Sequence, residues 1–139
     1  MRPLLLVGLM LAAWGCDYLD RTGDCREVAS VLNPVLDRLA GTVGHRLPDD
    51  STVWSKVADS YASISQDLQR IAIRDAQLSR STTDLQLNLS SAKDAARRGV
   101  IALQQHDRAA LERARSELRS LARRHTTIIN SLQAYCRSP

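Results

Sequence analysis

The sequence has no phenylalanine, and it has few residues of the kinds that build sheets, tight turns or membrane spans. Aromatic residues make up 4% of the 139 residues, so any core is aliphatic and rich in alanine. Four prolines and six glycines are few for a protein built from sheets and turns. No apolar run approaches the roughly 20 residues of a membrane-spanning helix. With 44% hydrophobic residues, the chain is expected to form one small helical domain.

The short motifs that carry catalysis or hold a cofactor are also missing. The sequence contains no Gly-x-Ser-x-Gly elbow, no glycine-rich phosphate-binding or dinucleotide-binding loop, and no Cys-x-x-Cys pair. No glutamate is followed three residues later by a histidine, as a di-iron bundle requires. We therefore expect no enzyme activity, no cofactor and no metal site in this chain.

Three histidines are the remaining candidates for ligand chemistry. His125 falls on the apolar stripe of its predicted helix, where a lone histidine is interpreted as a core residue. A competing hypothesis is a ligand-binding or metal-binding bundle that uses His45, His106 or a pocket beside Gly99. A chaperone-like protein with an exposed apolar groove is a further alternative.

The first residues have the features of an export signal. Met1-Arg2-Pro3 carries one positive charge, and residues 4–13 are almost all apolar. A charged start, about ten apolar residues and a small residue before a cleavage site are typical of a secretory signal peptide. We therefore assign residues 1–15 to a signal peptide, and residues 16–139 to the mature chain.

Ala13-Trp14-Gly15-Cys16 resembles the lipobox of bacterial lipoproteins. The resemblance implies that Cys16 is acylated and becomes the new N-terminus. It also implies an anchor in membrane lipid, on a protein of the bacterial cell envelope that faces the periplasm. Residues 16–23 would then be the lipidated cysteine and a short tether, and residues 24–139 the helical domain. The alternative is cleavage by ordinary signal peptidase, which recognises Ala13-x-Gly15 and would release a soluble periplasmic or secreted protein.

The chain has three cysteines, Cys16, Cys25 and Cys136. An exported protein enters an oxidising compartment, where cysteines pair, and three cysteines leave one unpaired. If Cys16 carries the acyl chains, Cys25 and Cys136 are the pair that forms the disulfide. The alternative is three free thiols.

Apolar residues recur at helical spacing in four segments. The first runs from Asp24, as N-cap, to about Ala40, and Pro34 is expected to kink it. Residues 41–50 form a loop, and Asp50 or Ser51 caps the second helix. The predicted stripes of the other three helices are Val57 to Ile71, Leu78 to Leu103 and Leu111 to Tyr135. Turns are predicted at 73–75, with 79–83 as the alternative, and at 106–107, with Asp75 and Asp107 as caps.

Four amphipathic helices with short connections predict an all-α, antiparallel up-down-up-down four-helix bundle. In that topology the start of the first helix and the end of the last lie at the same end of the bundle. Cys25 and Cys136 fall at these two positions, so the predicted disulfide and the predicted topology agree. We expect a monomer.

Positive charge gathers in the C-terminal half. Residues 16–79 carry 7 Lys/Arg and 10 Asp/Glu, a net −3, whereas residues 80–139 carry 11 and 5, a net +6. Four arginines share one flank of the last predicted helix, namely Arg108, Arg115, Arg119 and Arg123. The simplest interpretation is a solvated helix face. The functional one is a contact with an anionic envelope component or protein, since export argues against nucleic acid. The sequence thus favours a non-catalytic interaction or envelope-structural module.

Overall fold

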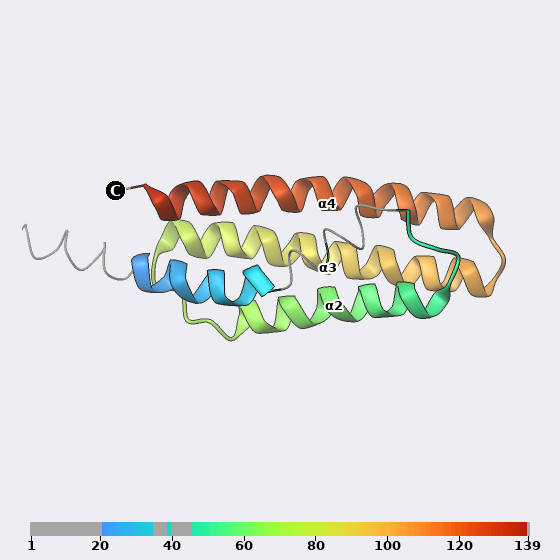
Figure 1. Cartoon of the computed structure of the whole chain (residues 1–139), viewed down its shortest axis with the longest axis horizontal. Coiled ribbons are helices and arrows are strands. Elements are labelled where there is room, and N and C mark those ends of the chain that lie inside the picture. The colour runs from blue at the N-terminus through green and yellow to red at the C-terminus, as the bar shows by residue number, and fades with distance from the viewer. Residues whose placement is uncertain (1–20, 35–38, 40–45, 139) are drawn as a thin grey trace, which may run out of the picture.

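The structure, a computed structural model, describes residues 21–34, 39 and 46–138, and every regular element in these residues is a helix. Residues 21–34 form a first helix, followed by α2 (Ser51–Gln69), α3 (Ala76–Gln104) and α4 (Arg108–Arg137). The last three lie side by side as long rods, with α3 in contact with both α2 and α4 (Figure 1). The described residues contain no strand, and the predicted all-α class is confirmed.

Aspartate caps open all three long helices. The side chains of Asp50, Asp75 and Asp107 accept hydrogen bonds from backbone N–H groups in the first turns of α2, α3 and α4, at 2.8, 2.8 and 2.9 Å. Each cap satisfies a donor that has no partner within the helix itself. The predicted turn at 73–75 is therefore confirmed, and the alternative turn at 79–83 is wrong because those residues lie inside α3.

Asp24 does not cap its own helix, contrary to the prediction, because residues 21–23 are already helical. Those three residues, assigned to the tether on sequence, thus extend the first helix. The Asp24 carboxylate is buried and accepts from the backbone N–H groups of Arg74 and Asp75, at 2.7 and 2.8 Å. It therefore holds the turn that precedes α3. The kink predicted at Pro34 adjoins residues 35–38, which lie outside the described residues.

The core is aliphatic and lies between the helices. Alanines on α3, namely Ala92, Ala95 and Ala96, are fully buried and permit close approach of the neighbouring helices. The largest buried side chain is Trp54 of α2, which has no exposed surface and packs directly on Gly99 of α3. A Cβ atom added at Gly99 would lie 2.1 Å from Cε3 of Trp54. The indole therefore fills the space beside Gly99, and the pocket hypothesised there is wrong.

Replacing Gly99 with alanine is expected to lower the free energy of unfolding by about 2–3 kcal/mol, because the new methyl group overlaps the Trp54 ring. Urea denaturation measures the effect. Gly23→Ala is the matched control: Gly23 is also helical, but nothing lies within 4 Å of its added Cβ. That change is expected to stabilise by about 0.5–1 kcal/mol. Equal effects of the two substitutions would contradict the packing argument.

Candidate functional site

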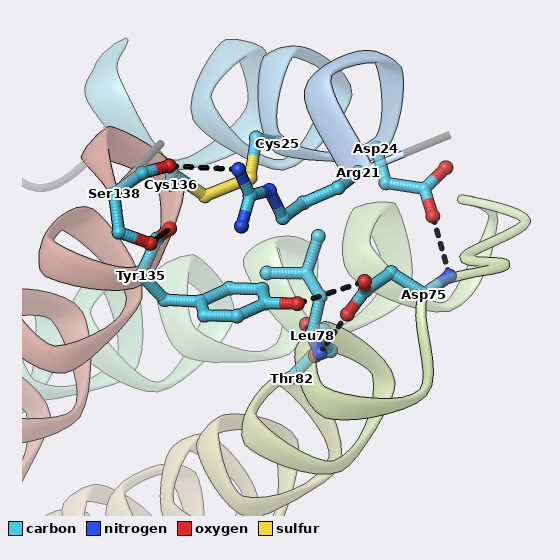
Figure 2. Close-up of a disulfide and its surroundings, with 9 residues drawn as sticks. All are labelled: Arg21, Asp24, Cys25, Asp75, Leu78, Thr82, Tyr135, Cys136 and Ser138. Atoms are coloured by element: carbon cyan, nitrogen blue, oxygen red, sulfur yellow. Dashed lines mark hydrogen bonds between the residues drawn. A yellow bond between two sulfur atoms is a disulfide. The ribbon is translucent and has the colours of Figure 1, made fainter. Parts of the chain in front are cut away.

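One end of the molecule is closed by a disulfide between Cys25 of the first helix and Cys136 of α4 (Figure 2). The two Cα atoms are 5.8 Å apart, and the bond joins positions separated by 111 residues. The predicted pairing is confirmed. In the chain-entropy description of cross-links, closing a loop of this length stabilises the fold by about 4–5 kcal/mol. We call this the disulfide end.

A polar network surrounds the disulfide. The hydroxyl of Tyr135 donates to Oδ2 of Asp75 at 2.8 Å, while Oδ1 of Asp75 caps α3 (Figure 2). Burial, together with the hydrogen bond to Asp75, raises the pKa of Tyr135, so the phenol remains a donor. Arg21 stacks over the Tyr135 ring and donates to the carbonyl of Ser138 at 2.7 Å. The network thus joins the first helix, the start of α3 and the end of α4, and the sequence pattern alone had not identified it.

Arg115 lies away from solvent, although the sequence placed it on an exposed basic flank. Its side chain is 6% exposed. The guanidinium donates to Glu112 at 2.7 Å and to the carbonyl of Leu47 at 2.9 Å, and it forms an ion pair with Asp49. It also lies 5.7 Å from the centre of the Trp54 ring. Arg115 therefore does not belong to a partner-binding face, because the segment that precedes α2 covers it.

That covering segment, residues 46–50, is held from two sides. Arg115 binds it from α4, and the indole nitrogen of Trp54 donates to the carbonyl of Pro48 at 3.0 Å. The hydrogen bond from Arg115 lowers the pKa of Asp49, which keeps that carboxylate charged. The arrangement is a structural clamp that fastens a non-helical segment to α2 and α4.

The other three predicted arginines, Arg108, Arg119 and Arg123, are exposed. None of them forms an ion pair with the described part of the chain. Glu112 lies at helical spacing from Arg108 and Arg115. It binds Arg115 at 2.7 Å and also Arg46 at 3.1 Å.

A buried polar cluster occupies the middle of the molecule. His125 of α4 is 8% exposed, as expected for a core residue, and its ring centre is 5.6 Å from that of Tyr61 of α2. Within the described residues, Nε2 of His125 and Oδ1 of buried Asn88 have no hydrogen-bond partner. Burial lowers the pKa of His125 to about 4, against a smaller opposing effect of the Asn88 backbone. Burial also raises the pKa of Tyr61 to about 12, so both rings are neutral.

The other candidates for ligand chemistry are His106 and His45. His106 is exposed in the turn between α3 and α4, where its φ is 55°. Its proposed companion His45 lies outside the described residues. The ranges 21–34 and 46–138 contain no group of three histidine, cysteine or acidic side chains placed to hold a metal ion.

Two further findings concern membrane-spanning helices and similarity to known proteins. Among the described residues, no helix combines the length and the apolar character needed to cross a bilayer. No protein-family model, curated protein or solved structure is significantly similar to the chain.

His125 makes the stability of the protein depend on pH. Its pKa in the folded state, about 4, lies below the ordinary 6.5, so the unfolded chain binds the proton more tightly. The neutral His125 makes its full contribution to the free energy of unfolding above pH 6.5. Between pH 6.5 and pH 4, about 3 kcal/mol of that free energy is lost. Urea denaturation between pH 7 and 4 is expected to show a smaller loss for His125→Leu than for the wild type. His106→Gln, in an exposed turn, is the control and retains the full loss; parallel curves for all three proteins would contradict the assignment.

Arg115→Gln is expected to lower the free energy of unfolding by about 2 kcal/mol, because it removes the guanidinium that donates to the Leu47 carbonyl and to Asp49, and one of the two donors to Glu112. Arg119→Gln, on the same helix but exposed, is the matched control and is expected to change stability by less than about 0.5 kcal/mol. Urea denaturation at neutral pH compares the two. A similar loss in both variants would show that Arg115 is not a clamp.

Proposed function

We propose that this chain is a lipid-anchored protein of the bacterial cell envelope, and that its domain faces the periplasm as a non-catalytic interaction or structural module. The observation that carries the proposal is the disulfide between Cys25 and Cys136. Structural disulfides form and persist in oxidising compartments outside the cytosol, which fits the export signal in residues 1–15. The pairing leaves Cys16 as the third cysteine, and acylation accounts for it.

The same bond supports a position for the proposed anchor at one end of the domain. Arg21 lies at the disulfide end, where it contacts Tyr135 and Ser138 (Figure 2). Cys16 precedes Arg21 by five residues, which span at most about 18 Å when extended. An acylated Cys16 would therefore hold the disulfide end close to the membrane, with the turn between α3 and α4 directed away from it.

We further propose that the helices form an antiparallel up-down-up-down bundle, with a kink in the first helix at Pro34. The short connections 70–75 and 105–107, and the contacts of α3 with α2 and α4, support this topology. The C-terminus lies at the same end as the start of the first helix in Figure 1, as the proposed topology requires. Proline at 34 removes a backbone donor from the first helix, which is the usual cause of a kink.

A non-catalytic role is supported by what the polar side chains do. The polar side chains around Arg115 and around Tyr135 have partners within the chain and hold segments of it together. These side chains therefore stabilise the fold. The surface that remains available for function is the exposed outer side of the helices.

The proposal is tested by the intact mass of protein extracted from bacterial membranes, measured with and without reductant. We expect a chain that begins at Cys16 and carries three acyl chains, and that gains two hydrogen atoms on reduction. Cys16→Ser is the control and should lose the acyl mass and leave the membrane fraction. An unacylated wild-type chain in the soluble periplasmic fraction would overturn the anchor, and an unchanged mass on reduction would overturn the disulfide.

A further inference from the structure

Helix α4 has two halves of different charge. Six of its seven arginines lie between residues 108 and 124, whereas residues 125–136 include no lysine, arginine, aspartate or glutamate. The uncharged half adjoins the disulfide, and the arginine-rich half adjoins the turn to α3. The positive charge of α4 is therefore concentrated at the end away from the disulfide.

Most of these arginines form no ion pair with the residues that the structure describes. Arg115 is buried and paired, but the other five arginines are exposed and form no ion pair with the described residues. We call these five residues the basic face: Arg108, Arg113, Arg119, Arg123 and Arg124. The two glutamates of α4 have other partners, since Glu112 binds Arg115 and Arg46, and Glu117 binds Arg98 at 2.7 Å. Among the described residues, Asp49 attracts Arg108, but no acidic side chain forms an ion pair with the basic face.

The distance from the disulfide end argues against the protein's own membrane as the partner, a step that depends on the proposed anchor. Arg124 precedes Cys136 by 12 residues, or about 18 Å of helix, and Arg108 lies about 24 Å further away. At physiological salt, exposed charges are screened beyond about 8 Å. For a bundle that stands on its disulfide end, the lipid headgroups are out of electrostatic reach.

The composition of the face also argues against binding to another membrane surface. Helices that lie in a membrane interface combine basic residues with an exposed apolar side. The described residues expose two large apolar side chains, Leu87 and Ile101, and both belong to α3. On α4, the exposed residues among the arginines include the hydroxyl side chains of Ser116 and Ser120. A polar, basic face of this kind fits a water-soluble polyanion.

We infer that the basic face binds an acidic segment of a partner protein. The planar guanidinium matches the two oxygens of a carboxylate, so arginine is well suited to aspartate-rich and glutamate-rich sequences. The face is about 24 Å long, which corresponds to about seven residues of extended chain or about sixteen residues of helix. An acidic segment of that length would supply the counter-charges that α4 lacks.

The inference is tested by binding of fluorescent poly-L-glutamate to the mature domain, with its disulfide intact, by anisotropy at several salt concentrations. Arg119→Gln combined with Arg123→Gln is expected to weaken binding about fivefold and to reduce the salt dependence. The matched control is Asn130→Glu combined with Ala134→Glu, in the exposed uncharged half of α4. Both double variants lower the net charge by two, and the control is expected to weaken binding less than about twofold.

Three results would overturn the inference. Equal weakening in both double variants would mean that net charge acts without a defined face. If the domain does not bind poly-L-glutamate, an acidic protein segment is excluded as the partner. If it binds only phosphatidylglycerol vesicles or isolated cell-wall sacculi, those are the partners of the basic face instead. Because the assay uses the domain without its acyl chains, its failure is independent of the mass measurement that tests the anchor.

Discussion

The bond between Cys25 and Cys136 holds the first helix against the end of α4, and the arrangement of the N-terminal part of the domain depends on it. Val28, Leu32 and Leu39, which lie in or beyond the described part of the first helix, pack on the core, and the disulfide adds a covalent link to these apolar contacts. The covalent link brings Asp24 to the turn before α3 and Arg21 to the end of α4. Polar contacts that are individually weak then act together, since the cross-link reduces the entropy lost when they form.

At the opposite end, a buried cation performs a similar task without a covalent bond. Arg115 binds a carbonyl and a carboxylate of residues 46–50, and Trp54 binds the same segment from α2. The guanidinium is compensated by two carboxylates, which offsets the cost of removing its charge from water. The buried guanidinium also affects the charge of the surface. Glu112 forms an ion pair with Arg115, so it does not neutralise the exposed arginines of α4. Stability and the charge of the proposed binding face are thus linked through one side chain.

The absence of phenylalanine shapes the centre of the molecule. With alanines along α3, the helices approach closely, and the few large rings occupy defined positions. Trp54 fits only because residue 99 is glycine. Tyr61 and His125 provide bulk in the middle of the core, and the neutral imidazole there makes the core sensitive to acid. A core of this composition depends more on individual residues than one with many interchangeable aromatic side chains.

Local patterns in the sequence were sufficient to predict the helices, their aspartate caps at Asp50, Asp75 and Asp107, and the Cys25–Cys136 pairing. Helix spacing and capping are properties of neighbouring residues, and the pairing follows once one of three cysteines is assigned to another role. The export signal and the acylation of Cys16 are also inferred from the sequence, and they remain part of the proposal. The roles of Asp24, Arg115 and Trp54 were decided by the tertiary structure alone. Each of them acts on a segment far away in the chain: Asp24 on the turn before α3, Arg115 on residues 46–50, and Trp54 on Gly99. Spacing along one helix identifies the side that a residue occupies, but only the packing of the whole chain determines which segment covers that side.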